Sequence, residues 1–125
     1  MVTANLISGN CSGVVIDAPG TTPNTYNQVL GNLIGTDATG ARAVPNLRYG
    51  VLTNNAGSNF VQNNRVSNNA LGIRMLYGAT GNTAQTNTAL SNQTSDLEDD
   101  NYPCANTWID NTFGTALGSG QTCIQ

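Results

Sequence analysis

Lysine and histidine are both absent from this chain of 125 residues, and charged residues make up only 9% of it. The few basic side chains are all arginine, and the net charge is −3. Neutralising phosphates requires a basic stripe, so we predict that nucleic acid is not a partner. Without histidine the chain also lacks the usual general base of serine and cysteine catalysis and a common ligand of zinc and copper.

Long hydrophobic runs are absent as well. A membrane-spanning helix needs about 20 apolar residues, whereas the apolar runs here are only a few residues long, so no membrane partner is predicted. Residues 1–4 contain neither the basic nor the apolar region of a signal peptide. The sequence therefore leaves two alternatives open, a cytoplasmic protein and a chain that begins inside a longer precursor.

Asparagine is abundant: it accounts for 19 of the 125 residues, and glycine and threonine are also frequent. All three residue types have low helix propensity. Asparagine and glycine tolerate the left-handed backbone that tight corners require. This composition favours short strands separated by turns, and the length indicates one domain over 1–125.

The asparagines mark an internal repeat. Five segments align, each with a leading asparagine and a mostly apolar residue two positions later; they begin at Asn5, Asn32, Asn64, Asn87 and Asn111. The sixth position of the four full copies is Asn10, Asp37, Asn69 and Asn92. Setting aside extra loops within 18–23 and 37–49 leaves a unit of about 22–24 residues. This is the length of a β-solenoid coil, and such coils bury their inward faces by stacking.

Stacked coils place equivalent residues about 4.8 Å apart. The leading asparagines would then form a ladder of side-chain hydrogen bonds. One internal apolar column is predicted at Ile7, Ile34, Val66, Ala89 and Phe113. A second is predicted at Val14, Val51, Ile73 and Leu97. Beside the second column, Arg74 would face Glu98 on the outer surface, in an exposed ion pair worth at most about 1 kcal/mol.

Several of these strings resemble the repeats of bacterial right-handed β-helix proteins of the pectin-lyase-like and periplasmic copper-processing group. The strings are NLISGN at 5–10, GNLIGTDATG at 31–40, YGVL at 49–52 and DLEDDNYPC at 96–104. The resemblance implies an all-β fold, a short single-stranded right-handed parallel β-helix of about five coils, with 101–125 as C-terminal coil and cap. It also implies an extracellular or cell-surface location.

Acidic residues are dense at one place only, namely Asp96, Glu98, Asp99 and Asp100. On a strand, three of them (96, 98 and 100) would share one face. That makes the cluster a candidate for glycoside hydrolysis or for Ca²⁺ binding. The favoured interpretation is an acidic turn before the terminal coil. Polysaccharide β-elimination, which the resemblance suggests, would need a basic residue beside the carboxylates, and Arg74 alone is placed for it. We assign no catalytic residue, and Ca²⁺ is the only candidate cofactor.

Tyr26, Tyr49 and Tyr77 lie beside long loops, and Tyr49 and Tyr77, with Arg74, are the candidates for binding a polysaccharide. The favoured alternative is packing of the tyrosines against the solenoid wall. Of the three cysteines, Cys104 and Cys123 bracket the C-terminal segment and are a candidate disulfide closing a loop of about 20 residues. Such a bond would contribute roughly 3 kcal/mol and imply an oxidising compartment; the alternative is three free thiols.

The first repeat begins at Asn5, which leaves little chain for the N-terminal cap that similar proteins carry. An uncapped coil exposes apolar side chains and unpaired strand edges. We therefore expect a non-catalytic structural or interaction module that forms homo-oligomers through this end, or a truncated parent. The second hypothesis is a carbohydrate-binding or polysaccharide-active protein.

Overall fold

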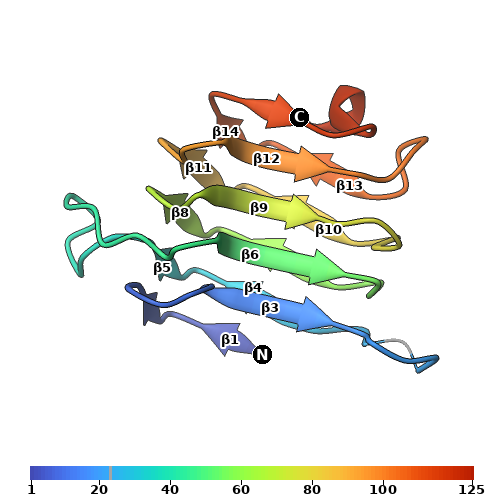
Figure 1. The fold of residues 1–125 in the computed structure, drawn as a ribbon, viewed down its shortest axis with the longest axis horizontal. Helices are drawn as coiled ribbons and strands as arrows, with labels where there is room; N and C mark the ends of the chain where they lie inside the picture. The colour runs from blue at the N-terminus through green and yellow to red at the C-terminus, as the bar shows by residue number, and fades with distance from the viewer. Residues whose placement is uncertain (23) are drawn as a thin grey trace.

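The chain winds through five stacked coils, and each coil contributes one strand to each of three parallel sheets (Figure 1). This computed structural model describes residues 1–22 and 24–125. Pro23, the last residue of the predicted loop 18–23, lies outside the described residues. The predicted fold class, an all-β solenoid of about five coils, is confirmed.

The strands are short and recur in the same order in every coil. Sheet A contains β1 (Val2–Thr3), β4 (Gln28–Leu30), β7 (Phe60–Gln62), β10 (Thr83–Gln85) and β13 (Thr107–Ile109). Sheet B contains β2 (Leu6–Ile7), β5 (Leu33–Ile34), β8 (Arg65–Ser67), β11 (Thr88–Leu90) and β14 (Thr112–Phe113). Sheet C contains β3 (Val14–Asp17), β6 (Tyr49–Asn54), β9 (Leu71–Met75), β12 (Ser95–Asp99) and β15 (Ala116–Leu117). A 3-10 helix, η1 (Gln121–Cys123), follows.

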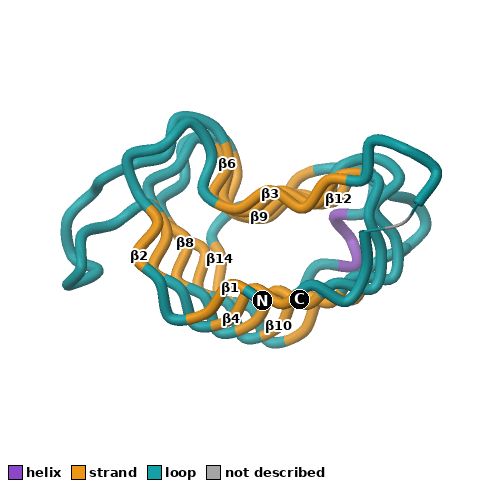
Figure 2. Tube along the Cα trace, turned by 90° about the horizontal axis from the view of Figure 1, so that it is seen from below, coloured by secondary structure: helices purple, strands orange, loops and turns teal. Residues whose placement is uncertain are grey.

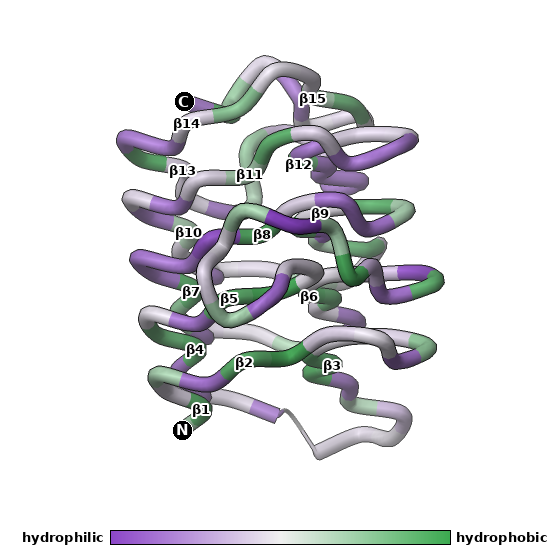
Figure 3. Tube along the Cα trace, turned by 90° about the vertical axis from the view of Figure 1, so that its left-hand side faces the viewer, coloured by the Kyte–Doolittle hydropathy of each residue, from purple (hydrophilic) through white to green (hydrophobic). Residues whose placement is uncertain are grey.

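Both predicted apolar columns are present in register, one along sheet B and one along sheet C. Sheet A adds a third column, formed by Val2, Val29, Val61, Ala84 and Trp108. The three columns meet inside the tube that Figure 2 shows end-on. Hydrophobic strand segments and hydrophilic corners recur from coil to coil (Figure 3). Because one coil cannot bury its inward face alone, the core exists only through stacking.

Asparagine side chains form three ladders along the solenoid. In each, the backbone N–H and Nδ2 of one asparagine donate to Oδ1 of the asparagine one coil further on; for Asn32 and Asn64 both distances are 2.9 Å. The predicted ladder runs through Asn5, Asn32, Asn64, Asn87 and Asn111. A second runs through Asn10, Asn46, Asn69 and Asn92. A third runs through Asn27, Asn59, Asn82 and Asn106.

The second ladder corrects the predicted repeat at one position. Asp37 occupies the sixth position of its repeat, but Asn46 takes the place in the ladder. Asp37 instead opens the inserted loop, where its Oδ1 accepts hydrogen bonds from the backbone N–H groups of Thr39, Ala41 and Arg42. The inserted loop therefore begins at the sixth residue of the motif. The asparagine that joins the ladder at this corner comes only after the loop, at Asn46.

All three ladders have the same direction, so the last asparagine of each must find an acceptor. Asn92 donates to Asp96, and Asn106 donates to Asp99. Asn111 donates to the backbone carbonyl of Gln125. The last asparagine of a ladder still has donors that need an acceptor. A carboxylate only accepts hydrogen bonds, so it is well suited to end the ladder.

The C-terminal segment folds against the last coil. A disulfide joins Cys104 to Cys123, and the exposed Cys11 is free. Ile124 is buried and belongs to the core. The backbone N–H of Gly120 donates to the carbonyl of Asp99. This end of the apolar interior is thus covered by the chain's own final residues.

Candidate functional site

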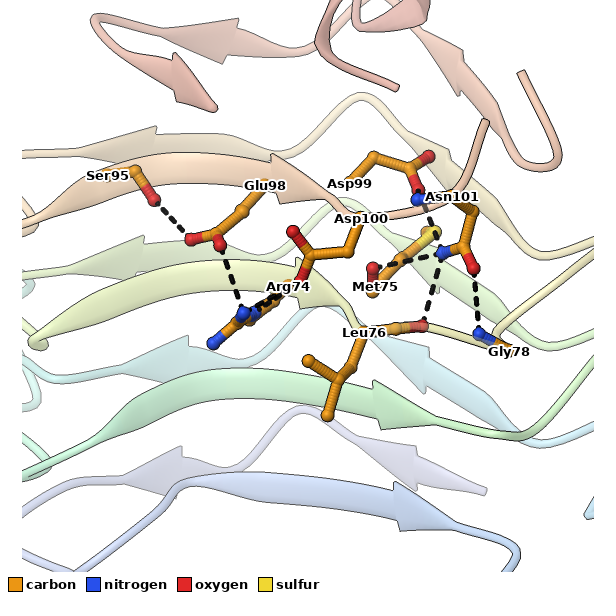
Figure 4. Close-up of polar contacts among 9 residues, drawn as sticks. All are labelled: Arg74, Met75, Leu76, Gly78, Ser95, Glu98, Asp99, Asp100 and Asn101. Carbon is orange, nitrogen blue, oxygen red and sulfur yellow. Dashed lines mark hydrogen bonds and ion pairs between the residues drawn. The ribbon is translucent and has the colours of Figure 1, made fainter. Parts of the chain in front are cut away.

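Three charged side chains meet on the outer face of sheet C (Figure 4). Nη2 of Arg74 lies 2.7 Å from Oδ2 of Asp100 and 3.2 Å from Oε1 of Glu98. Nε of Arg74 also donates to the same Asp100 oxygen at 3.0 Å. Glu98 pairs with Arg74 in the strand register, which confirms the predicted ion pair and adds Asp100 to it. Ser95 donates its hydroxyl to the other Glu98 oxygen at 3.2 Å.

The electrostatics of this cluster fix the state of Arg74. Burial lowers the pKa of the guanidinium, but the hydrogen bond to Asp100 and the charge of Glu98 outweigh burial and raise the pKa above its ordinary value. Arg74 therefore stays protonated and cannot serve as a general base. The cluster combines two carboxylates with one cation, and both carboxylates contact the guanidinium.

The acidic cluster of the sequence is divided between two environments: the expected shared face holds for Glu98 and Asp100 but is wrong for Asp96. Glu98 and Asp100 are partly exposed and contact Arg74, whereas Asp96 and Asp99 are buried ends of asparagine ladders. The cause lies at the start of β12 itself. Asp96 lies between the paired residues 95 and 97, at the level that Gly50 and Gly72 occupy in the preceding coils, and here alternation breaks because residues 95, 96 and 97 are all buried.

Asp96 and Asp99 are held by many donors. Asp96 accepts hydrogen bonds from Asn92 and from the backbone N–H groups of Gly114 and Thr115. Burial raises the pKa of Asp96, but these hydrogen bonds outweigh burial and lower it. Oδ2 of Asp99 accepts a hydrogen bond of 2.8 Å from Nε1 of Trp108. Within 1–22 and 24–125, no three Asp, Glu, Cys or His side chains gather to hold a metal ion.

The two tyrosines predicted to bind a ligand lie at opposite ends of the strands of sheet C. Tyr49 begins β6, and the guanidinium of Arg48 lies 5.5 Å from its ring centre. Tyr77 follows β9 at the other end and is 82% exposed. The structure brings Tyr77 beside Tyr102, which is 80% exposed and which the sequence analysis missed. The two rings border a hollow of about 230 Å³.

The N-terminal end of the solenoid differs from the C-terminal end. Within the described chain, strands at both ends have a partner on one side only, β1, β2 and β3 at one end and β13, β14 and β15 at the other, so the difference lies in the ladders and the apolar lining. Oδ1 of Asn5, Asn10 and Asn27 receives no hydrogen bond from the described residues. A hollow of about 120 Å³ opens here, and its apolar lining includes Met1, Val2, Val14, Val15, Ile16 and Val29. Met1 and Val15 are 79% and 50% exposed.

The repeated topology, the stacked apolar columns and the asparagine ladders define a parallel β-helix, a form of β-solenoid. No protein-family model, curated protein or solved structure matches the chain. No helix within the described part of the chain is long and apolar enough to span a membrane.

Proposed function

We propose that this protein is a non-catalytic structural or interaction module that associates with a second copy of itself through its N-terminal coil. The observation that carries the proposal is the difference between the two ends. At the C-terminal end, every ladder reaches an acceptor and the terminal segment contributes Ile124 to the core. At the N-terminal end, ladder acceptors and apolar side chains are open together, beside strand edges of the kind that both ends have.

An open strand edge is a template for pairing with another chain. A second copy offers the same edges and the same apolar lining, so two N-terminal coils can meet around a twofold axis. Such an isologous contact closes on itself. At the opposite end the last asparagine of each ladder already donates to an acceptor of its own chain, so head-to-tail stacking offers no ladder donor to the open acceptors. The proposal therefore specifies a dimer rather than a filament.

Two positions on one outer column test the proposal. Val15 and Leu117 lie at opposite ends of a column that runs through Leu52, Arg74 and Glu98. They are 50% and 42% exposed, so a lysine at either position leaves the core intact. Val15 also lines the N-terminal hollow. The Val15→Lys variant carries the test, and Leu117→Lys is its matched control.

Sedimentation velocity over a wide range of protein concentration provides the measurement. We expect the unaltered protein and Leu117→Lys to form dimers as concentration rises, and Val15→Lys to remain monomeric. A monomer at the highest concentration would overturn the proposal. Dimerisation lost equally in both variants, or growth into filaments, would also contradict it.

We also propose that the chain belongs to the pectin-lyase-like and periplasmic copper-processing β-helix group and acts outside the cell or at its surface. The motifs at 31–40 and 96–104, together with the parallel solenoid, support the first part. The Cys104–Cys123 disulfide supports the second, because disulfides persist in oxidising compartments. Recovery of the protein with this bond intact from a non-reducing extract of the secreted fraction would test the location.

A further inference from the structure

We propose that Tyr77 and Tyr102 form a binding site for a sugar ring of a neutral polysaccharide. The two tyrosines lie on consecutive coils, on the corner that links sheet C to sheet A. Both side chains are about four-fifths exposed, at 82% and 80%. They border a hollow of about 230 Å³ whose other lining residues are Gly78, Thr80, Asn101 and Ala105. This corner is separate from the N-terminal coil proposed for dimerisation.

Tyr77 is held by a tight turn. The backbone N–H of Ala79 donates to the carbonyl of Leu76 at 2.9 Å, and Gly78 has φ of +84°. A positive φ at the third residue is what a type II turn requires. A Cβ at Gly78 would also lie 2.9 Å from Oδ1 of Asn55, so this position is restricted to glycine. The turn leaves Tyr77 exposed on a backbone that has little freedom.

Asn101 and the disulfide fix the second loop relative to the first. Oδ1 of Asn101 accepts the backbone N–H of Gly78 at 2.9 Å, and its Nδ2 donates to the carbonyls of Met75 and Leu76 at 3.1 Å (Figure 4). Cys104, two residues after Tyr102, is joined to Cys123. Asn101 is therefore a positioning residue. The backbones that carry the two tyrosines are held in place before any ligand arrives, which reduces the entropic cost of binding.

The chemistry of the hollow selects a neutral, hydroxylated ligand. None of its six lining residues is charged, so a carboxylate or phosphate ligand would find no counter-charge. Tyrosine presents a large apolar ring and a polar hydroxyl at low conformational cost. The apolar C–H face of a sugar can lie against such a ring, and the lining residues Tyr77, Tyr102 and Thr80 each carry a hydroxyl that can bond the hydroxyls of the sugar. Asn101 is occupied in positioning the loops.

The size of the hollow favours a single sugar ring over a peptide. Pockets for drug-sized ligands range from about 300 to 1,000 Å³, and this hollow is smaller. Proline-rich peptides bind along extended aromatic grooves, whereas the aromatic rim here consists of two residues on one corner. An open hollow of this kind would hold one ring of a longer chain that continues over the surface.

Affinity electrophoresis and isothermal titration can test the site with three soluble polymers: xylan, hydroxyethyl cellulose and polygalacturonate. We expect retardation by at least one of the two neutral polymers and none by the charged one. Tyr77→Ala and Tyr102→Ala should each weaken binding roughly tenfold, which corresponds to about 1.4 kcal/mol. Because both side chains are exposed, thermal unfolding of the two variants should match that of the unaltered protein.

Tyr26→Ala is the matched control, since Tyr26 is 76% exposed but lies outside the hollow. Binding should be unchanged in this variant. Equal losses in all three variants, retardation by polygalacturonate alone, or no retardation by any polymer would each overturn the proposal. Tighter binding of a proline-rich peptide than of the neutral polymers would assign the hollow to a different class of ligand and would also overturn it.

Discussion

Oδ1 of Asp96 accepts two hydrogen bonds from Asn92, one from the backbone N–H at 3.0 Å and one from Nδ2 at 2.9 Å. This is the geometry that joins asparagines within a ladder, here with a carboxylate at the final position. The other oxygen, Oδ2, accepts the N–H groups of Gly114 and Thr115. One aspartate therefore ends a ladder and binds the next turn of the last coil.

Replacing Asp96 by asparagine should destabilise the protein by about 2–3 kcal/mol. The substitution preserves size but supplies an NH₂ group where donors already converge, so buried donors lose their acceptor. The free energy of unfolding in urea measures the effect. Asp110→Asn is the matched control, because Asp110 is an exposed aspartate of the same terminal region. We expect the control to change stability by less than about 0.5 kcal/mol; an equal loss in both variants would contradict the role of Asp96.

The difference in stability between the unaltered protein and Asp96→Asn should depend on pH. The pKa of Asp96 is lowered in the folded protein. Its contribution is therefore fully present above the unfolded aspartate value of about 3.9 and is lost as pH falls through the folded pKa. Unfolding free energies of both proteins between neutral and acidic pH provide the measurement. The gap should be constant above about pH 5 and should narrow below pH 4; a gap that widened in acid would have the wrong sign.

Regular spacing explains which parts of this fold could be predicted. The columns and the first ladder were found because the motif keeps fixed offsets from each leading asparagine. The third ladder had an equally regular signal, since Asn27, Asn59, Asn82 and Asn106 each lie five residues before a leading asparagine. The second ladder was obscured at one coil, because the inserted loop places Asp37 in the motif and Asn46 in the structure.

Simple strand alternation failed at the acidic segment for a local reason. Alternation assigns Asp96 to the face of Glu98 and Asp100. The preceding coils carry Gly50 and Gly72 at the equivalent position, where the chain turns inward beside the second ladder. The column of glycines was visible in the sequence. The alternation rule, however, does not predict that an aspartate at a glycine position replaces the next asparagine of the ladder. The repeat also could not predict that Tyr77 and Tyr102 lie side by side, because both residues belong to corner loops and not to the repeated strands.

The glycine column makes a separate prediction. A Cβ at Gly72 would lie 2.8 Å from Nδ2 of Asn92 and would also contact the backbone carbonyl of Asp96. Gly72→Ala should therefore cost about 1–3 kcal/mol through overpacking. A Cβ at Gly20 meets nothing within 4 Å, so Gly20→Ala is the control. The control should lie between neutral and about 1 kcal/mol more stable, because alanine restricts the unfolded chain. Urea unfolding of both variants distinguishes these outcomes, and a neutral Gly72→Ala would show that the corner can relax.

The Arg74 cluster should show unequal coupling to its two carboxylates. Asp100 accepts two hydrogen bonds from the guanidinium, at 2.7 and 3.0 Å, whereas Glu98 makes one contact of 3.2 Å. All three side chains are between 13% and 23% exposed, so water screens the charges only in part.

Double-mutant cycles that combine Arg74→Met with Asp100→Asn or with Glu98→Gln measure these couplings through unfolding free energies. We expect about 1 kcal/mol for Arg74 with Asp100 and a smaller value for Arg74 with Glu98. Added salt should reduce both couplings. Glu98 would be the principal partner if its cycle gave the larger value, and the short contacts to Asp100 would then carry little of the pairing energy.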